Sequence, residues 1–408
     1  ELVVQLEMAV QGRSCSGLVC GVAHGGRKRR PVFVFPGQGG QWVSMGKALL
    51  GEEPVFAEQV EALATQMSEY TDWSLHEVLR GEGEASTLER VDVIQPALFA
   101  MQVGLSALWR SWGVEPAAVV GHSRGEIAAA HVAGALSLED ACLISCLRSQ
   151  IVRKASGKGK MAFVDLPVQQ AREALRGYEG RLAIGTVNNE HSVVLSGESE
   201  SLEEVFARLE QRGVFCRWVK VDYASHGPQM DPLKEELLRA LSGVSPQRAT
   251  VPLYSTVTAT RMEEGFSAEY WERNLRETVQ FWSALEALTA DGFDTYVEVN
   301  PHPLLLPTIK DGLSEKVAQL AVVGSIYRDD GGSKRLLTSL GELYGCGGWE
   351  AFERFYPRAG RVVDLPTYAF QRQRYWIEPG RRNTRAGVDT GHPLLGQRVH
   401  AAGTGATF

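Results

Sequence analysis

A pentapeptide at residues 121–125 constrains the fold of this chain more than any other segment. It has the sequence Gly-His-Ser-Arg-Gly and stands between an apolar run, 117–120, and a segment of small residues, 126–135. A G-x-S-x-G pattern between a buried strand and a helix is typical of a sharp turn that holds the serine in a strained backbone position. Glycine at the two flanking positions lets the neighbouring chain pass close by. We therefore predict that Ser123 is a nucleophile at the N-terminus of a helix, whose free N–H groups face the reacting carbonyl.

Further apolar runs extend this pattern into a layered α/β fold. Residues 31–35, 251–255 and 295–299 predict short buried strands, and the segments between them predict helices. One helix is expected from about 138 to 154, with Ser137 as its N-cap and two acidic residues in its first turn. Strands that alternate with helices in this way favour the α/β class.

The segment 158–226 breaks the alternation and predicts a separate subdomain. Its order of elements, β-α-β-β-α-β, is that of a ferredoxin-like unit. We therefore expect an α/β, hydrolase-like core formed by residues 31–157 and 227–325, with the ferredoxin-like subdomain inserted between them. The six elements are expected at 161–165, 168–175, 182–187, 192–195, 202–212 and 215–219.

Composition excludes several classes of partner. The net charge is −7, and the single basic cluster, at residues 27–30, precedes an apolar strand as a solvated linker would, so nucleic acid is not an expected partner. The sequence has neither a run of 18 apolar residues nor a signal peptide. We therefore expect a cytoplasmic protein without a membrane partner. The chain begins without Met, and we expect it to be part of a longer polypeptide. The six cysteines follow no disulfide or zinc-site spacing and are expected to be reduced (positions 15, 20, 142, 146, 216 and 346).

A serine hydroxyl needs a base to take its proton, and nine histidines compete for that role. His122 adjoins Ser123, so its side chain is expected to point away, and His302 lies in an Asn-Pro-His-Pro turn. His226 stands where the chain returns from the inserted subdomain. Because a cleft forms between two subdomains, His226 is a candidate base, although spacing alone leaves the other histidines open.

The donors that would stabilise an oxyanion also have candidates in the sequence. One is the backbone N–H of Arg124, which follows the nucleophile. The second is expected from the glycine-rich loop 35–41. This loop does not fit a nucleotide site, since a dinucleotide fingerprint requires Gly at position 42, which is Trp, and a P-loop ending at residues 46–47 requires Ser or Thr at position 48, which is Ala.

Taken together, these motifs resemble the malonyl-CoA:acyl-carrier-protein transacylase family, and within it the acyltransferase domains of modular type I polyketide synthases. The motifs occur in the family's order over residues 31–325. They are Val-Phe-Pro-Gly-Gln-Gly at 34–39, Gly-His-Ser-Arg-Gly-Glu at 121–126, Leu-Arg-Ser-Gln at 147–150 and Tyr-Ala-Ser-His at 223–226.

The resemblance implies a role for each matching residue. His226 would be the general base for Ser123, oriented by a backbone carbonyl, which alignment with the family assigns to Gln280. The backbone N–H of Gln38 would be the second oxyanion donor. Arg148, which by itself would be expected on an exposed helix face, would hold the free carboxylate of the acyl group, as a planar guanidinium can do with two hydrogen bonds.

The resemblance also implies a substrate. Tyr223 and Ser225, in the Tyr-Ala-Ser-His motif, are similar to the methylmalonyl-selective subgroup, and a small residue at 225 would leave room for an α-methyl group. Arg124 departs from that subgroup, which has Gln or Met there, and brings a second cation near the acyl pocket. Malonyl and larger extender units therefore remain alternatives.

The expected partners follow from the same resemblance. An acyl-CoA would donate the acyl group, a phosphopantetheinylated acyl carrier protein would accept it, and no resident cofactor or metal is expected. The flanks would be a ketosynthase–acyltransferase linker (1–30), a post-acyltransferase linker (326–378) and the start of a dehydratase-like domain (379–408). A serine hydrolase or editing thioesterase and a catalytically silent docking module are the alternative classes.

Overall fold

The computed structural model divides the chain into two units, Glu1–Pro357 and Arg358–Phe408. The second unit contains three short antiparallel strands, β11 (Val388–Asp389), β12 (Gln397–Ala401) and β13 (Gly405–Thr407). Most of the expected post-acyltransferase linker beyond residue 348 lies outside the described residues. The described residues are 2–13, 15, 17–22, 29–83, 88–348, 355, 364, 366, 388–392, 394–395, 397–401 and 405–407.

The first unit is built around a six-stranded sheet with the strand order β10-β9-β1-β2-β7-β8. Every neighbouring pair is parallel except β7 and β8. This mixed α/β sheet confirms the predicted fold class of the core. Its strands are β1 (Pro31–Phe35), β2 (Ala118–Gly121), β7 (Leu253–Tyr254), β8 (Arg261–Met262), β9 (Thr295–Glu298) and β10 (Ala321–Gly324).

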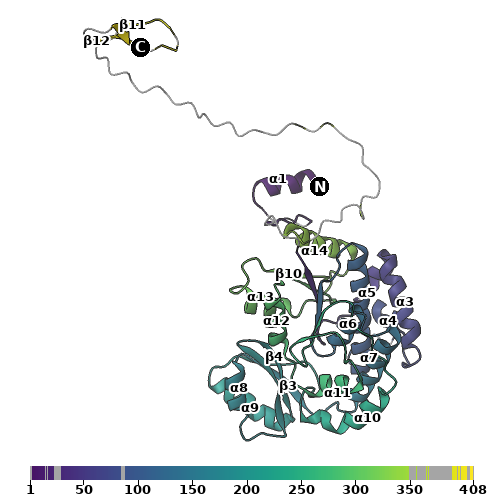
Figure 1. The fold of residues 1–408 in the computed structure, drawn as a ribbon. Coiled ribbons are helices and arrows are strands. Elements are labelled where there is room, and N and C mark those ends of the chain that lie inside the picture. Colours follow the sequence, from purple (N-terminus) through teal and green to yellow (C-terminus); the bar gives the residue numbers. More distant parts are fainter. Residues whose placement is uncertain are drawn as a thin grey trace. The chain divides into compact units, whose positions relative to one another are not determined.

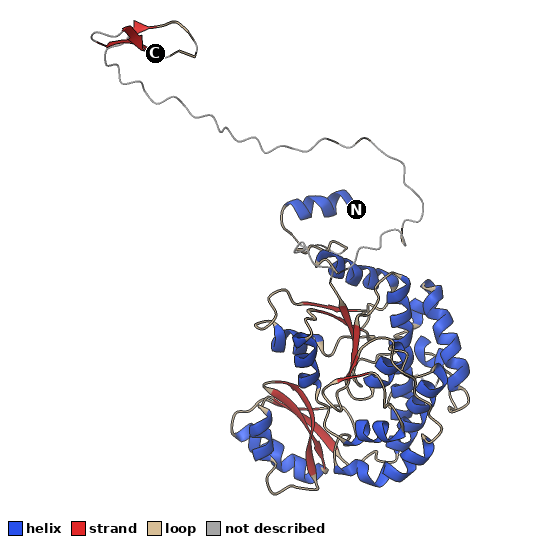
Figure 2. Cartoon of the chain, in the orientation of Figure 1, coloured by secondary structure: helices blue, strands red, loops and turns tan. Residues whose placement is uncertain are grey.

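Both faces of this sheet are buried, since all five residues of β1 are buried and successive side chains of a strand point to opposite sides. In β1, Phe33 and Phe35 join the larger apolar cluster, whereas Val32 and Val34 join a second one. The helices accordingly lie on both sides of the sheet (Figures 1 and 2). The larger cluster includes residues of α2 (Lys47–Glu52), α3 (Pro54–Met67), α4 (Leu75–Arg80), α5 (Val91–Ser111), α6 (Gly125–Val132), α7 (Leu138–Arg153), α10 (Lys234–Ala240), α11 (Ala268–Arg276) and α14 (Ser333–Gly345), and the second one α12 (Phe281–Ala290) and α13 (Leu306–Leu313).

Two of these helices bear directly on the sequence predictions. Helix α7 begins where expected, since the Ser137 side chain accepts a hydrogen bond from the N–H of Asp140 at 3.0 Å. By length and composition, helix α5 is apolar enough to cross a membrane. However, 94% of its most apolar 18-residue stretch is buried inside the protein. Its apolar surface is therefore already used in the core.

The predicted ferredoxin-like elements form a second, antiparallel sheet with the order β4-β5-β3-β6. Its helices α8 (Val168–Ala174) and α9 (Ser199–Gln211) pack on one face, against Ala162, Val164 and Leu195. The alternate residues Met161, Phe163 and Val194 line a cavity on the other face. The strands are β3 (Lys160–Val164), β4 (Leu182–Asn189), β5 (Ser192–Gly197) and β6 (Cys216–Trp218).

The small sheet is joined to the core through the edge of β4. The Val187 N–H donates to the Val279 carbonyl at 2.9 Å, and the Val279 N–H donates to the Gly185 carbonyl at 2.8 Å. The side chain of Thr278 also donates to the carbonyl of Ile184. This short parallel bridge fixes the inserted sheet beside the segment that precedes α12.

We expect Gly125→Ala to lower the free energy of unfolding by at least about 2–3 kcal/mol. A Cβ at Gly125 would lie 2.0 Å from the carbonyl oxygen of Phe35, so the backbone at the end of β1 would have to move. Gly51→Ala is the control, because a Cβ at that position of α2 meets nothing within 4 Å. Thermal unfolding of both variants measures the difference, and equal melting temperatures would contradict the expected contact.

Candidate active site

The turn that carries Ser123 has the strained geometry expected from its sequence. Ser123 has a φ of 56°, in the left-handed region that non-glycine residues seldom adopt. A Cβ at Gly121 would lie 2.3 Å from the backbone nitrogen of Glu126, so a side chain there would collide with the following helix. The predicted need for glycine at both positions that flank this turn, 121 and 125, is thus confirmed.

His226 lies against Ser123 although 103 residues separate them in the chain. The Oγ of Ser123 is 2.6 Å from Nε2 of His226, and Nδ1 of the same ring is 3.0 Å from the carbonyl oxygen of Glu277. A carbonyl can only accept a hydrogen bond, so the proton of the neutral ring belongs on Nδ1. Nε2 is then free to accept the hydroxyl proton of Ser123.

The assignment of Gln280 as the residue that orients the histidine is wrong. The carbonyl beside Nδ1 belongs to Glu277, just after α11. Gln280 is instead the N-cap of α12, and its carbonyl accepts from the N–H of Ala284 in the first turn of that helix. The Gln280 carbonyl is therefore already used in the first turn of that helix.

His226 is itself held in an uncommon backbone conformation. Its φ is 59°, and its N–H donates to the carbonyl of Leu275 at 2.9 Å. The preceding residue, Ser225, is fixed to the small sheet, since its carbonyl accepts from the hydroxyl of Ser196. His226 is therefore held by both subdomains, as its place in the sequence suggested.

The loop after β1 lies beside the Ser123 turn, because Phe35 and Gly121 are partners at the ends of two parallel strands. Among the hydrogen bonds of the described residues, none uses the backbone N–H of Gln38 or of Arg124. Both residues line the cavity that contains Ser123. Their amides are available for the oxyanion role predicted for them.

Arg148 is buried, contrary to the exposure that its helical position alone suggested. It is 2% exposed, because α7 packs against α3, α5 and α6. Its Nη1 donates to the side-chain oxygen of Gln95 at 3.2 Å, and its Nε has no partner. None of the ion pairs among the described residues includes Arg148. Burial lowers the pKa of this guanidinium to about 10, so it is still charged at neutral pH.

These groups surround one cavity of about 290 Å³ between the core and the small sheet. The cavity is lined by seven residues that were predicted from the sequence, namely Gln38, Ser123, Arg124, Arg148, Tyr223, Ser225 and His226. Gln280 does not line it. His122 does, but its ring pairs with the side chain of Asn188 at 3.0 Å and not with the nucleophile.

Buried side chains connect these parts, and two of them, Glu126 and Asn274, had no role predicted from the sequence. The Nε2 of Gln95 contacts the hydroxyl of Tyr223 at 3.0 Å, and that hydroxyl contacts the side-chain oxygen of Gln38 at 3.0 Å. Glu126, three residues after the nucleophile, accepts from Asn274 at 2.6 Å, and Asn274 also donates to the Ser123 carbonyl. A charged residue in the apolar segment after the turn was the signal that could have identified Glu126.

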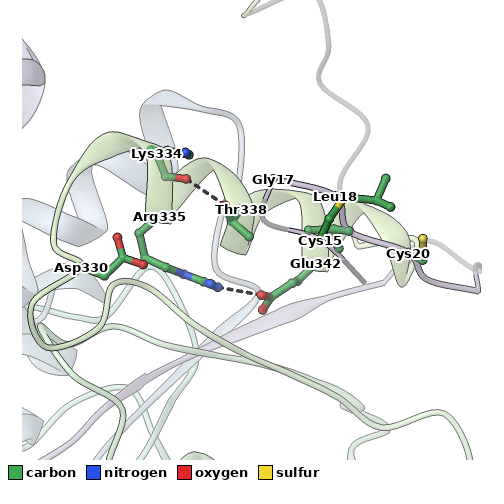
Figure 3. A pocket seen from close by; sticks show the side chains of 10 residues that line it. Cys15, Gly17, Leu18, Cys20, Asp330, Lys334, Arg335, Thr338 and Glu342 are labelled. Carbon is green, nitrogen blue, oxygen red and sulfur yellow. Dashed lines mark hydrogen bonds and ion pairs between the residues drawn. The ribbon is translucent and has the colours of Figure 1, made fainter. Parts of the chain in front are cut away.

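A second pocket, of about 480 Å³, lies between residues 15 and 17–20 and helix α14 (Figure 3). Two of its charged side chains pair with each other, since Arg335 lies 2.6 Å from Glu342. It contains none of the residues predicted for the site. The chemistry expected from the sequence therefore belongs to the Ser123 cavity.

The α/β fold and the Ser123 cavity suit a protein that transfers acyl groups. Comparison with known proteins gives the same class. The family described as "Acyl transferase domain" matches residues 32–348. The chain therefore belongs to the acyl transferase domain family, in the form found in modular polyketide synthases, and is an acyltransferase.

Several relatives support this assignment. Polyketide synthase GfsB of Streptomyces halstedii is 46% identical over 97% of this chain, and erythronolide synthase EryA2 of Saccharopolyspora erythraea is 45% identical over 86%. The chain spans only 7% and 10% of those two proteins. The acyltransferase domain from module 8 of the salinomycin polyketide synthase superposes with a TM-score of 0.83 at 42% identity, over 86% of this chain and 83% of that one.

We expect a fluorophosphonate probe to label Ser123, and the labelling rate to stay nearly constant from pH 8 to pH 5.5. Burial, with the nearby charge of Arg148, lowers the pKa of His226 to about 3, so the ring remains an unprotonated base throughout this range. A histidine of ordinary pKa would lose about tenfold in rate at pH 5.5. Intact-protein mass spectrometry measures the rate, with Ser123→Ala as control, and a tenfold fall would contradict the depressed pKa.

Proposed function

We propose that this domain transfers a malonyl-type extender unit, with methylmalonyl preferred, from coenzyme A to the phosphopantetheine thiol of an acyl carrier protein. One observation carries the proposal: the Ser123–His226 pair, 2.6 Å apart, shares its cavity with the buried Arg148. A serine–histidine pair alone suits many acyl transfers. A buried guanidinium without a carboxylate partner favours an acyl group that brings its own.

In the proposed first half-reaction, Nε2 of His226 takes the proton of Ser123 as Oγ attacks the thioester carbonyl. The amides of Gln38 and Arg124 stabilise the oxyanion that develops on the carbonyl oxygen. The tetrahedral intermediate then collapses, the C–S bond breaks, and the imidazolium of His226 returns the proton to the departing coenzyme A thiolate. The acyl group is left as an ester on Ser123.

The second half-reaction follows the same steps in reverse. The phosphopantetheine thiol of the carrier protein enters after coenzyme A has left and gives its proton to His226 as sulfur attacks the Ser123 ester. Collapse of the second tetrahedral intermediate breaks the C–O bond, and His226 returns the proton to Oγ. The Glu277 carbonyl keeps the ring in the tautomer that both halves require and stabilises the imidazolium.

The proposed preference for a methyl branch rests on the wall of the cavity near the base. Ser225 is buried and small, and its hydroxyl lies 3.5 Å from the sulfur of Met161. Tyr223 is kept in place by its contacts with Gln95 and Gln38. A small residue beside an adaptable methionine leaves room for one additional carbon at the α-position.

The central experiment incubates the intact protein with equal concentrations of malonyl-CoA and methylmalonyl-CoA and identifies the ester on Ser123 by mass spectrometry. We expect methylmalonyl to dominate by about 10- to 200-fold, the range that one methyl group can supply. Predominant malonylation would overturn the methylmalonyl preference. Rapid loss of the ester in the absence of carrier protein would favour a hydrolase.

Arg148→Ala should lower kcat/KM for methylmalonyl-CoA by at least about 30-fold. Removing one partner of a desolvated ion pair costs about 2–5 kcal/mol, and the substrate carboxylate would lose its partner. Arg239→Ala, at an exposed position of α10, is the matched control and should transfer the acyl group like the wild type. Unchanged transfer by Arg148→Ala would contradict the carboxylate role.

A further inference from the structure

The Ser123 cavity contains a second buried guanidinium, which belongs to Arg124. This side chain is 3% exposed, and none of the ion pairs among the described residues includes it. Buried charges are ordinarily paired, because an unpaired one is costly. Arg124 and Arg148 together therefore make the cavity strongly positive.

The hydrogen bonds of Arg124 hold its charge in place without neutralising it. Its Nη1 donates to the carbonyl of Gln95 at 3.0 Å, and its Nη2 lies 3.4 Å from the carbonyl of Gly37. Its Nε has no partner. Both acceptors are neutral backbone groups, one on α5 and one on the loop that carries Gln38, so the guanidinium keeps its full positive charge beside the acyl pocket.

The acid that lies closest in sequence does not supply the missing counterion. Glu126 is fully buried and accepts hydrogen bonds from Thr256, Tyr270 and Asn274. Burial raises the pKa of Glu126 to about 7, so even its ionisation is incomplete at neutral pH. Burial, together with repulsion from Arg148, lowers the pKa of Arg124 to about 9, as expected for a cation without a partner.

We propose that Arg124 is a specificity-determining residue, whose fixed positive charge adds to that of Arg148 and makes the pocket select acyl groups with a free carboxylate over equally long groups without one. This inference rests on the proposed transfer of malonyl-type acyl groups. It assigns to the side chain at position 124 a role separate from that of its backbone N–H.

The alternative is that Arg124 only braces the loop that carries Gln38. The two roles predict different kinetics. A brace would affect every acyl group equally, because any oxyanion depends on the same amides. A charge would affect only carboxylated acyl groups, and its removal would not destabilise the empty protein, since an unpaired buried cation opposes folding.

The test compares acylation of Ser123 by methylmalonyl-CoA and by propionyl-CoA, which has the same chain without the carboxylate. Arg124→Gln removes the charge and keeps a side chain that can donate to the two carbonyls, and Arg124→Lys keeps the charge. We expect Arg124→Gln to lower the ratio of the two kcat/KM values by about tenfold or more, the scale of one screened charge–charge interaction. The ratio should fall because methylmalonyl-CoA loses far more than propionyl-CoA, and Arg124→Lys should retain most of the wild-type ratio.

Thermal unfolding of the same variants completes the test. Arg124→Gln should melt at or above the wild-type temperature. An equal fall for both esters, an unchanged ratio, or a Gln variant that is unstable or unfolded would each overturn the proposal in favour of a brace. If the wild type formed no methylmalonyl ester at all, the proposed function itself would fail, whereas a normal wild type with an unchanged ratio in Arg124→Gln would overturn only the role of Arg124.

Discussion

The site depends on the close contact between the Ser123 turn and the end of β1. The backbone of Gly125 lies so near the Phe35 carbonyl that no Cβ fits between them, and the His122 N–H donates to the same carbonyl at 2.8 Å. This contact brings two loops together at the carboxyl edge of the sheet, where ligands of open α/β sheets ordinarily bind. One loop carries Ser123 and the other carries Gln38, so both candidate oxyanion amides reach the same cavity.

A second constraint joins Ser123 to His226 through the core. The carboxylate of Glu126 and the carbonyl of Ser123 share the side-chain amide of Asn274. The adjoining residue, Leu275, and then Glu277 supply the two carbonyls that hold His226. A buried polar group left without a partner lowers stability by about 1–3 kcal/mol. The hydrogen bonds of this network therefore oppose displacement of either Ser123 or His226. Ser123 and His226 are thus kept in contact although 103 positions separate them in the sequence.

The sequence was informative wherever the backbone conformation depends on the type of side chain, or on the lack of one in glycine. Apolar runs located β1, β2 and β9, and the glycines of the turn located Ser123. It was less informative about carbonyl groups, because every residue has one and only the folded chain selects Glu277 over Gln280. The burial of Arg148 was also missed, since a polar segment of helix gives no sign of being enclosed by three other helices. The left-handed conformation of His226 had no glycine or asparagine to indicate it.

The buried charges connect recognition with activation in the proposed reaction. After burial, the charge of Arg148 is the next cause that lowers the pKa of His226, so the empty site holds a weak base. A carboxylate bound at Arg148 would offset that repulsion and raise the basicity of the ring when a matching acyl group is present. An acyl group without a carboxylate would meet both an unpaired cation and a weaker base. Selectivity would then arise in the chemical step as well as in binding, because the bound carboxylate would strengthen the base that acts in the transition state.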